Sequence, residues 1–149
     1  MVKPPPSKRP LGAILDDNIV PKMVQLLQRF KRLPAAFYQT QAGNEPVRDW
    51  LKQASSKEDR VRIGTAIKRV EIEWPIGRPT CAPLSDGLWE IRVKLANNRT
   101  ARVIFCVHDE TMVLLHGFIK KTGKVPQDDL DLATKRKRDV ETAHAKGKT

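Results

Sequence analysis

Apolar residues recur at helical spacing in the first half of the chain and alternate with polar residues in the second half. Between residues 45 and 54 they recur every three or four positions after Asn44, which predicts a first helix. A second helix is predicted to begin at Ser55 or Ser56 and to continue to Val70. Trp74-Pro75 ends this helical hairpin, and residues 75–87, rich in proline and glycine, are predicted to form an irregular connection.

Three alternating segments follow, over residues 88–95, 101–107 and 112–119. Their expected core-face residues are Trp89, Ile91, Val93 and Leu95; then Ala101, Val103, Phe105 and Val107; then Val113, Leu115, Gly117 and Ile119. Short polar turns join the segments, which predicts an antiparallel meander. A further strand is predicted over residues 35–40, and a helix from Pro126 toward Lys146. The predicted fold class is therefore α+β.

The amino-terminal segment differs in composition from the rest. Residues 1–34 hold seven basic and two acidic residues, begin with a proline- and lysine-rich arm, and continue in a predicted helix over residues 18–32. We expect a basic extension over residues 1–34 and one globular domain over residues 35–149. No signal peptide or membrane-spanning segment is visible in this sequence, and the two cysteines suit a reducing cytoplasm.

The chain is strongly basic, with 28 lysines and arginines against 17 acidic residues and a formal charge of +11. Such a charge attracts polyanions, so nucleic acid is the first partner class to consider. The alternative is a basic surface that only maintains solubility or meets an acidic protein. Cys81 and Cys106 lack the spacing of metal ligands, and no phosphate-binding glycine loop is present, so no metal and no cofactor is expected.

The expected strand register brings the polar faces together. Core face must match core face, because a one-residue slip would bury charge. With residues 97–99 as a three-residue loop, Lys94 pairs with Arg102, and Arg102 with His116 on the third strand. One row then holds Lys94, Arg102 and His116, Arg92 lies two residues along on the same face, and Lys120 and Lys121 follow the third strand.

Such a row suits RNA chemistry. Neighbouring cations across a sheet repel, which favours an anion between them. Guanidinium groups bind phosphate oxygens in pairs, and histidine transfers protons near neutral pH. Taken singly, such residues are more often structural: Arg92 and Lys94 would be solvated strand residues, and His116 a side chain packed under the final helix. Only the clustering favours a site for metal-independent RNA cleavage.

Six blocks of the sequence resemble the phage-derived HigB-like branch of the RelE/ParE toxins. They are EPVRDWL (45–51), KEDRVRIG (57–64), WPIG (74–77), GLWEIR (87–92), ARVIFC (101–106) and LHGFIKKT (115–122). The resemblance covers about residues 35–140. It implies a RelE-like fold, in which a helical hairpin packs on a curved antiparallel sheet with a carboxyl-terminal helix. It also implies a toxin of a type II toxin–antitoxin system that cleaves mRNA on the ribosome and inhibits translation.

The resemblance also implies roles for individual residues. The catalytic residues would be Arg92 and Arg102 on the phosphate, with His116 as a candidate acid or base; the RNA-binding residues would be Lys94, Lys120, Lys121 and Lys124. Attack by a ribose 2′-hydroxyl would give a 2′,3′-cyclic phosphate. The implied partners are the ribosome, mRNA and a small helix-turn-helix antitoxin. Two features depart from the family pattern. Glu90 stands where relatives often have a basic residue, and no tyrosine follows the third strand.

Two other functions remain open at this stage. A ParE-like protein shares this fold but inhibits DNA gyrase without cleaving RNA, and the arginines at 92 and 102 argue mildly against it. An inactive RNA-binding or adaptor module would keep the charge without the chemistry. From the sequence alone, the double variant Arg92→Ala with Arg102→Ala is expected to keep the fold and to lose growth arrest and mRNA cleavage.

Overall fold

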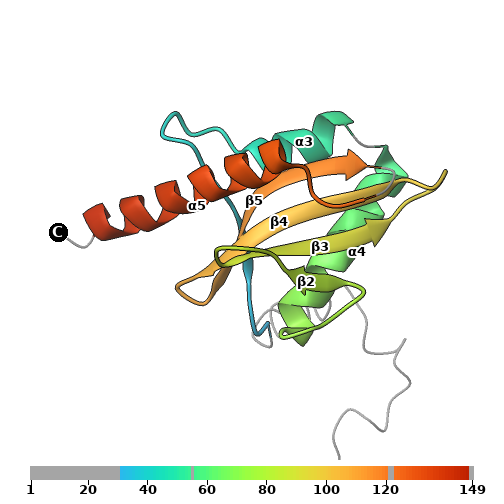
Figure 1. Ribbon diagram of the computed structural model, residues 1–149, viewed down its shortest axis with the longest axis horizontal. Helices are drawn as coiled ribbons and strands as arrows, with labels where there is room; N and C mark the ends of the chain where they lie inside the picture. Colours follow the sequence, from blue (N-terminus) through green and yellow to red (C-terminus); the bar gives the residue numbers. More distant parts are fainter. Residues whose placement is uncertain (1–30, 55, 121–122, 148–149) are drawn as a thin grey trace, which may run out of the picture. The chain divides into compact units, whose positions relative to one another are not determined.

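A five-stranded sheet with helices on both faces makes up the described chain (Figure 1). The computed structural model describes residues 31–54, 56–120 and 123–147. The elements are β1 (Ala35–Phe37), α3 (Pro46–Ala54), α4 (Lys57–Glu73), β2 (Cys81–Pro83), β3 (Leu88–Lys94), β4 (Thr100–His108), β5 (Thr111–Lys120) and α5 (Gln127–Gly147). The amino-terminal arm and nearly all of the helix predicted over 18–32 lie outside the described residues.

The α+β fold class is confirmed, and so are the helical hairpin, the three-stranded meander and the last helix. The strand order is β1-β5-β4-β3-β2, with β1 parallel to β5 and the other pairs antiparallel. Residues 75–87 are not wholly irregular as predicted, because β2 extends the sheet beside β3. This three-residue strand is too short to show an alternating pattern. None of the described helices is long and apolar enough to span a bilayer.

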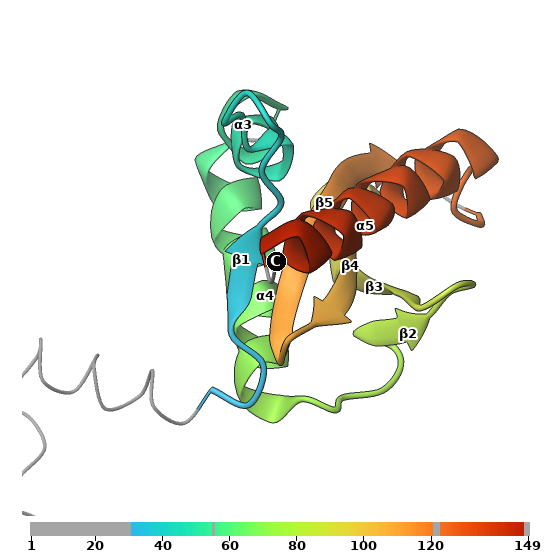
Figure 2. The same cartoon turned by 90° about the vertical axis from the view of Figure 1, so that its left-hand side faces the viewer.

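The sheet is buried on both faces, not on one. Helices α3 and α4 cover one face and α5 covers the other, as Figure 2 shows. The α4 face buries Ile91, Val103 and Phe105, as predicted. The α5 face buries Ile104 and Cys106, which a half-buried strand would have exposed to water. Val107, predicted in the core, is exposed at the end of β4.

The β3–β4 register differs from the predicted one by two residues. Arg92 pairs with Arg102, Lys94 with Thr100 and Glu90 with Ile104. The chain reverses one residue earlier than expected, because Asn97 and Asn98 both adopt the left-handed conformation, with φ of 62° and 59°. Asparagine tolerates this conformation better than most residues. A reversal one residue earlier shifts every cross-strand pair by two, so the predicted faces are kept.

A β-bulge shifts the third strand as well. Asp109 and Glu110, with φ of 50° and 59°, form the tip between β4 and β5. The register then changes between Ile104 and Phe105, leaving Leu115 as the extra residue of β5. Val113 and Leu115 consequently pack in the α5 cluster, not on the predicted face. Beyond the bulge, Ile104 pairs with His116 and Arg102 with Phe118.

The β3–β4 turn is tied to the start of α4. The Arg99 guanidinium donates to both carboxylate oxygens of Asp59, at 2.9 and 3.1 Å. Ser56 caps the helix by accepting from the Asp59 amide. These hydrogen bonds, with that from Arg99 first, hold the pKa of Asp59 below its ordinary value. The turn that sets the register is thus fixed to the helical hairpin.

Gly117 of β5 lies against the Trp50 ring of α3, and a Cβ there would overlap the ring. We expect Gly117→Ala to lower the free energy of unfolding by about 1–3 kcal/mol, the usual cost of overpacking. Gly64→Ala on α4 is the matched control, because no atom lies within 4 Å of a Cβ there. It should stabilise the protein by about 0.5–1 kcal/mol. Urea denaturation compares the two, and equal stabilities would contradict the packing argument.

Candidate functional site

Three cross-strand rows on the α5 face of the sheet carry five of the predicted site residues, Arg92, Lys94, Arg102, His116 and Lys120. They are Glu90, Ile104 and His116; then Arg92, Arg102 and Phe118; then Lys94, Thr100 and Lys120. The predicted row of Lys94, Arg102 and His116 is therefore wrong, because each of these residues lies on a different row. The two-residue shifts in both hairpins cause the error. Instead, Arg92 and Arg102 are direct cross-strand partners.

The anion between the two arginines belongs to the protein itself. Glu90 is only 1% exposed. Its Oε1 lies 2.7 Å from Arg92 Nε, and its Oε2 lies 3.5 Å from Arg102 Nη1. The expected repulsion between neighbouring cations is thus relieved without an external phosphate. Two guanidinium groups and one carboxylate leave this cluster with a net positive charge.

The two arginines have different environments. The Arg102 side chain is 7% exposed, and besides Glu90 it donates to the carbonyl oxygen of Gly123. Its Nε is buried and finds no acceptor within the part of the chain that the structure describes. The Arg92 side chain is 41% exposed, and its only hydrogen bond among the described residues is from Nε to Glu90. The two terminal nitrogens of Arg92 therefore make no hydrogen bond among the described residues, whereas Arg102 is largely committed to the protein.

His116 packs beneath α5. Its Nε2 lies 2.6 Å from Oδ1 of Asp129, near the start of that helix. Its ring stacks on Phe118, with centroids 5.5 Å apart. An acidic partner on one ring nitrogen fixes the orientation of the ring and leaves the other nitrogen for exchange with a substrate. The arrangement also fits a purely structural histidine.

The four lysines predicted to bind RNA differ in their positions. Lys94 is exposed on the third row, and Lys120 Nζ donates to the Lys124 carbonyl oxygen at 3.3 Å. Lys124 is exposed in the segment before α5. Lys121 lies outside the described residues, so its assignment stays a prediction. We call the row of Arg92, Arg102 and Phe118 the arginine row. Lys94 and Lys120 lie on the row next to it, and Lys124 is hydrogen-bonded to Lys120.

Thiol chemistry finds no support at this face. Burial raises the pKa of both Cys81 and Cys106 to about 11, so both are neutral thiols at pH 7. Within the described residues, no three histidine, cysteine or acidic side chains are grouped so that they could hold a metal ion. The functional groups described on the three rows of the α5 face are guanidinium, imidazole and ammonium groups, a threonine hydroxyl, and the Glu90 carboxylate.

Sequence reasoning missed three contributors to this site. Glu90 shares the polar face with Arg92 by alternation, yet its burial follows only from the docking of neighbouring elements. Phe118 is placed beside Arg102 by the bulge in β5. Asp129 is explained in the sequence as a helix-start acid, and nothing local indicates that it meets His116.

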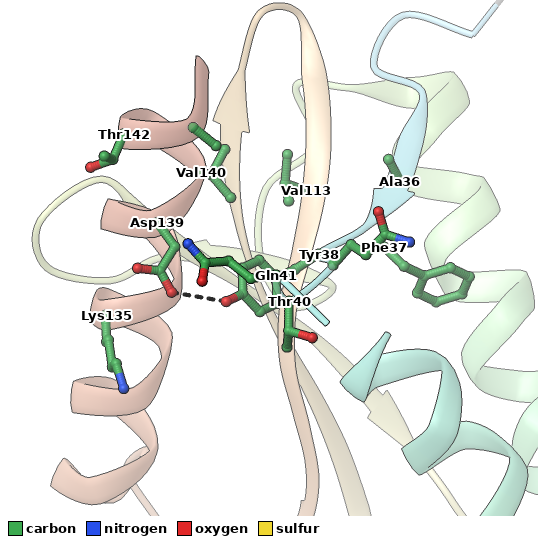
Figure 3. A pocket seen from close by; sticks show the side chains of 12 residues that line it. Ala36, Phe37, Tyr38, Thr40, Gln41, Val113, Lys135, Asp139, Val140 and Thr142 are labelled. Atoms are coloured by element: carbon green, nitrogen blue, oxygen red, sulfur yellow. Dashed lines mark hydrogen bonds between the residues drawn. The ribbon is translucent and has the colours of Figure 1, made fainter. Parts of the chain in front are cut away.

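A separate hollow of about 930 Å³ lies between the segment that follows β1 and α5 (Figure 3). Tyr38 donates a hydrogen bond of 2.9 Å to Asp139 on its wall, and Lys135 also lines it. The Arg136 guanidinium lies 5.6 Å from the centre of the Tyr38 ring. Of the predicted catalytic and RNA-binding residues that the structure describes, none lines this hollow. It is therefore distinct from the arginine row.

Tyr38 gives a direct test of this packing, because it is the chain's only tyrosine. Burial, and then the hydrogen bond to Asp139, raise its pKa above the ordinary 10.0. Ultraviolet absorbance should show tyrosinate forming above pH 10, and Asp139→Asn should lower the midpoint only in part. The unfolded chain deprotonates first, so Tyr38 stabilises the fold below pH 10 and this contribution is lost as pH rises through the raised pKa. A midpoint at or below 10 in the folded protein would refute the contact.

The fold indicates the class of protein. A helical hairpin on one side of a mixed five-stranded sheet and a carboxyl-terminal helix on the other are consistent with a RelE-like α+β fold. Residues 49–138, more than half of the chain, match the family model described as phage-derived protein Gp49-like (DUF891). The chain belongs to this phage-derived Gp49-like family, which is related to RelE-type toxins. No curated protein gives a significant match.

Proposed function

We propose that this protein is the toxin of a type II toxin–antitoxin system, of the HigB-like branch, and that it cleaves mRNA on the ribosome. The observation that carries the proposal is the direct pairing of Arg92 and Arg102 on a face that also holds His116 and lysines. Membership of a family related to RelE-type toxins supports the same reaction class. The guanidinium of Arg92, whose side chain is 41% exposed, has the planar geometry that matches two phosphate oxygens.

The proposed reaction uses no metal. The ribose 2′-hydroxyl attacks the adjacent phosphorus and gives up its proton, while the bond from phosphorus to the 5′-oxygen breaks. The products are a 2′,3′-cyclic phosphate and a 5′-hydroxyl, which takes up a proton. Arg92 stabilises the negative charge that develops on the phosphoryl oxygens, and the ring nitrogen of His116 that does not face Asp129 transfers a proton. Lys94, Lys120 and Lys124 contact the RNA backbone.

The reaction is tested by incubating purified protein with mRNA, with and without programmed ribosomes, and by analysing the chemistry of the new RNA ends. We expect cleavage that requires ribosomes and leaves 2′,3′-cyclic phosphate and 5′-hydroxyl ends. Cleavage of free RNA at similar rates would reject the ribosomal target. Intact RNA under all conditions, from a protein that arrests growth, would reject the nuclease.

The proposed partner is a small helix-turn-helix antitoxin whose gene lies beside that of the toxin. Both proteins would act in the cytoplasm of the host. Neutralisation requires a complex stable enough to withhold the toxin from the ribosome. Co-expression of a neighbouring open reading frame of that type should restore growth and copurify with the protein. Restoration of growth by an unrelated helix-turn-helix protein would contradict a cognate pair.

A further inference from the structure

Glu90 is the one acidic side chain on the three cross-strand rows of the α5 face, and it is fully buried. A buried carboxylate is costly unless charged donors surround it. Glu90 has two such donors, Arg92 Nε on its own strand and Arg102 Nη1 across the sheet. Its two oxygens are divided between them. One carboxylate thereby fixes the relation between the two arginines.

The geometry at Arg92 determines which nitrogens remain available. A guanidinium is planar, so a hydrogen bond at Nε restrains the orientation of the whole fork. The 2.7 Å bond to Glu90 takes Nε of this 41% exposed side chain, and the two terminal nitrogens make no hydrogen bond to the described residues. Those terminal nitrogens are the ones that hold a phosphate in the two-pronged mode.

Arg102 uses its donors differently. One terminal nitrogen faces Glu90, and the other donates to the carbonyl oxygen of Gly123. Gly123 precedes α5, whose Asp129 faces His116. Arg102 thus links the Glu90 carboxylate to the segment before α5. That helix carries Asp129, which contacts His116.

We propose that Glu90 is a positioning residue that turns the Arg92 fork toward the RNA and holds Arg102 as a clamp on the segment before α5. Arg92 then contacts the scissile phosphate, while Arg102 acts through Gly123. The inference rests on the proposed function for its effect on cleavage, whereas the arrangement of the arginines is independent of it. Orientation fixed before substrate binds lowers the barrier of the chemical step.

The test is Glu90→Gln, which keeps the size of the side chain and removes its charge. The variant gains one unit of positive charge, so its KM for programmed ribosomes should stay the same or fall. Its kcat should fall on the order of 10²-fold, because the fork loses its orientation. A role in folding alone would not separate kcat from KM in this way. Both constants are measured by single-site cleavage of a short mRNA on ribosomes.

Glu73→Gln is the matched control. Glu73 accepts from Arg69 Nε at 3.1 Å, the same kind of pair, but both side chains are about half exposed and lie on α4. This variant should cleave as wild type does. Should Glu90→Gln fail to fold, Glu90→Asp serves in its place, since it keeps the charge and withdraws the carboxylate from Arg92 by one methylene. The same fall in kcat is expected.

A second measurement does not depend on cleavage. Solvent exchange of arginine Nε protons, followed by NMR, should show slow exchange for Arg92 in wild type and fast exchange in Glu90→Gln. Unchanged exchange, or a folded Glu90→Gln variant with wild-type kcat, would overturn the assignment. A wild-type protein that cleaves no RNA would reject the proposed function only, and the exchange result would still decide the role of Glu90.

Discussion

Arg92→Ala is expected to reduce ribosome-dependent mRNA cleavage on the order of 10²- to 10³-fold while leaving the fold intact. Removing a single donor that stabilises developing negative charge has effects of that size in enzymes. The Arg92 side chain is 41% exposed and Glu90 keeps Arg102 as a partner, so the free energy of unfolding should fall by about 1.5 kcal/mol, the lower end for a hydrogen bond to a charged group, and the protein should stay folded. Cleavage on ribosomes and thermal unfolding are measured on the same preparations.

Two further variants make this result specific. Arg92→Lys keeps the charge but not the fork, and should also lose most of the cleavage. Arg69→Ala removes an arginine that is exposed on α4 and paired through Nε with Glu73, and should leave cleavage unchanged. A well-folded Arg92→Ala protein with wild-type cleavage would remove Arg92 from the site.

Arg102→Ala is expected to act on stability first, lowering the free energy of unfolding by about 3 kcal/mol. Breaking a buried ion pair typically costs 3–5 kcal/mol because a buried charge is left without its partner. Here the lower end applies, since Glu90 keeps its 2.7 Å contact with Arg92. The structure therefore changes the expectation for Arg92→Ala with Arg102→Ala, which leaves Glu90 buried with neither donor and should unfold.

Chemical denaturation of the single and double variants measures this effect. Replacing both partners, as in Glu90→Leu with Arg102→Leu, should restore most of the stability, because apolar side chains of similar volume replace a buried pair at little cost. If Arg102→Ala is as stable as wild type, the ion pair with Glu90 does not hold the site together.

The elements of the fold were predictable because each carries a local pattern. Helix α4 has Ser56 as its cap, acidic residues in its first turn and apolar residues at helical spacing. Strand β3 alternates between apolar and polar residues along most of its length, and strand β4 is a nearly continuous apolar run bounded by polar turns. The register was not predictable in the same way. It depends on the conformation of Asn97 and Asn98 and on one extra residue in β5, and neither changes the apolar pattern that identifies a strand.

The site was predictable in its components but not in its arrangement. Alternation placed Arg92 and Arg102 on one face, and an error of two residues preserves that face while changing each neighbour. The burial of Glu90 and the contact of His116 with Asp129 depend on how α5 docks across the sheet. Such long-range contacts leave no periodic trace in the sequence. The prediction therefore assigned to an external phosphate a place that Glu90 occupies.

The central claim is that the arginine row acts on mRNA in the ribosome. Expression of the protein in bacteria, followed by mapping of mRNA ends across the transcriptome, tests it most directly. We predict new ends that are phased with codons in translated regions and that are missing from cells expressing Arg92→Ala. Intact mRNA accompanied by double-strand DNA breaks would contradict the account and indicate gyrase as the target.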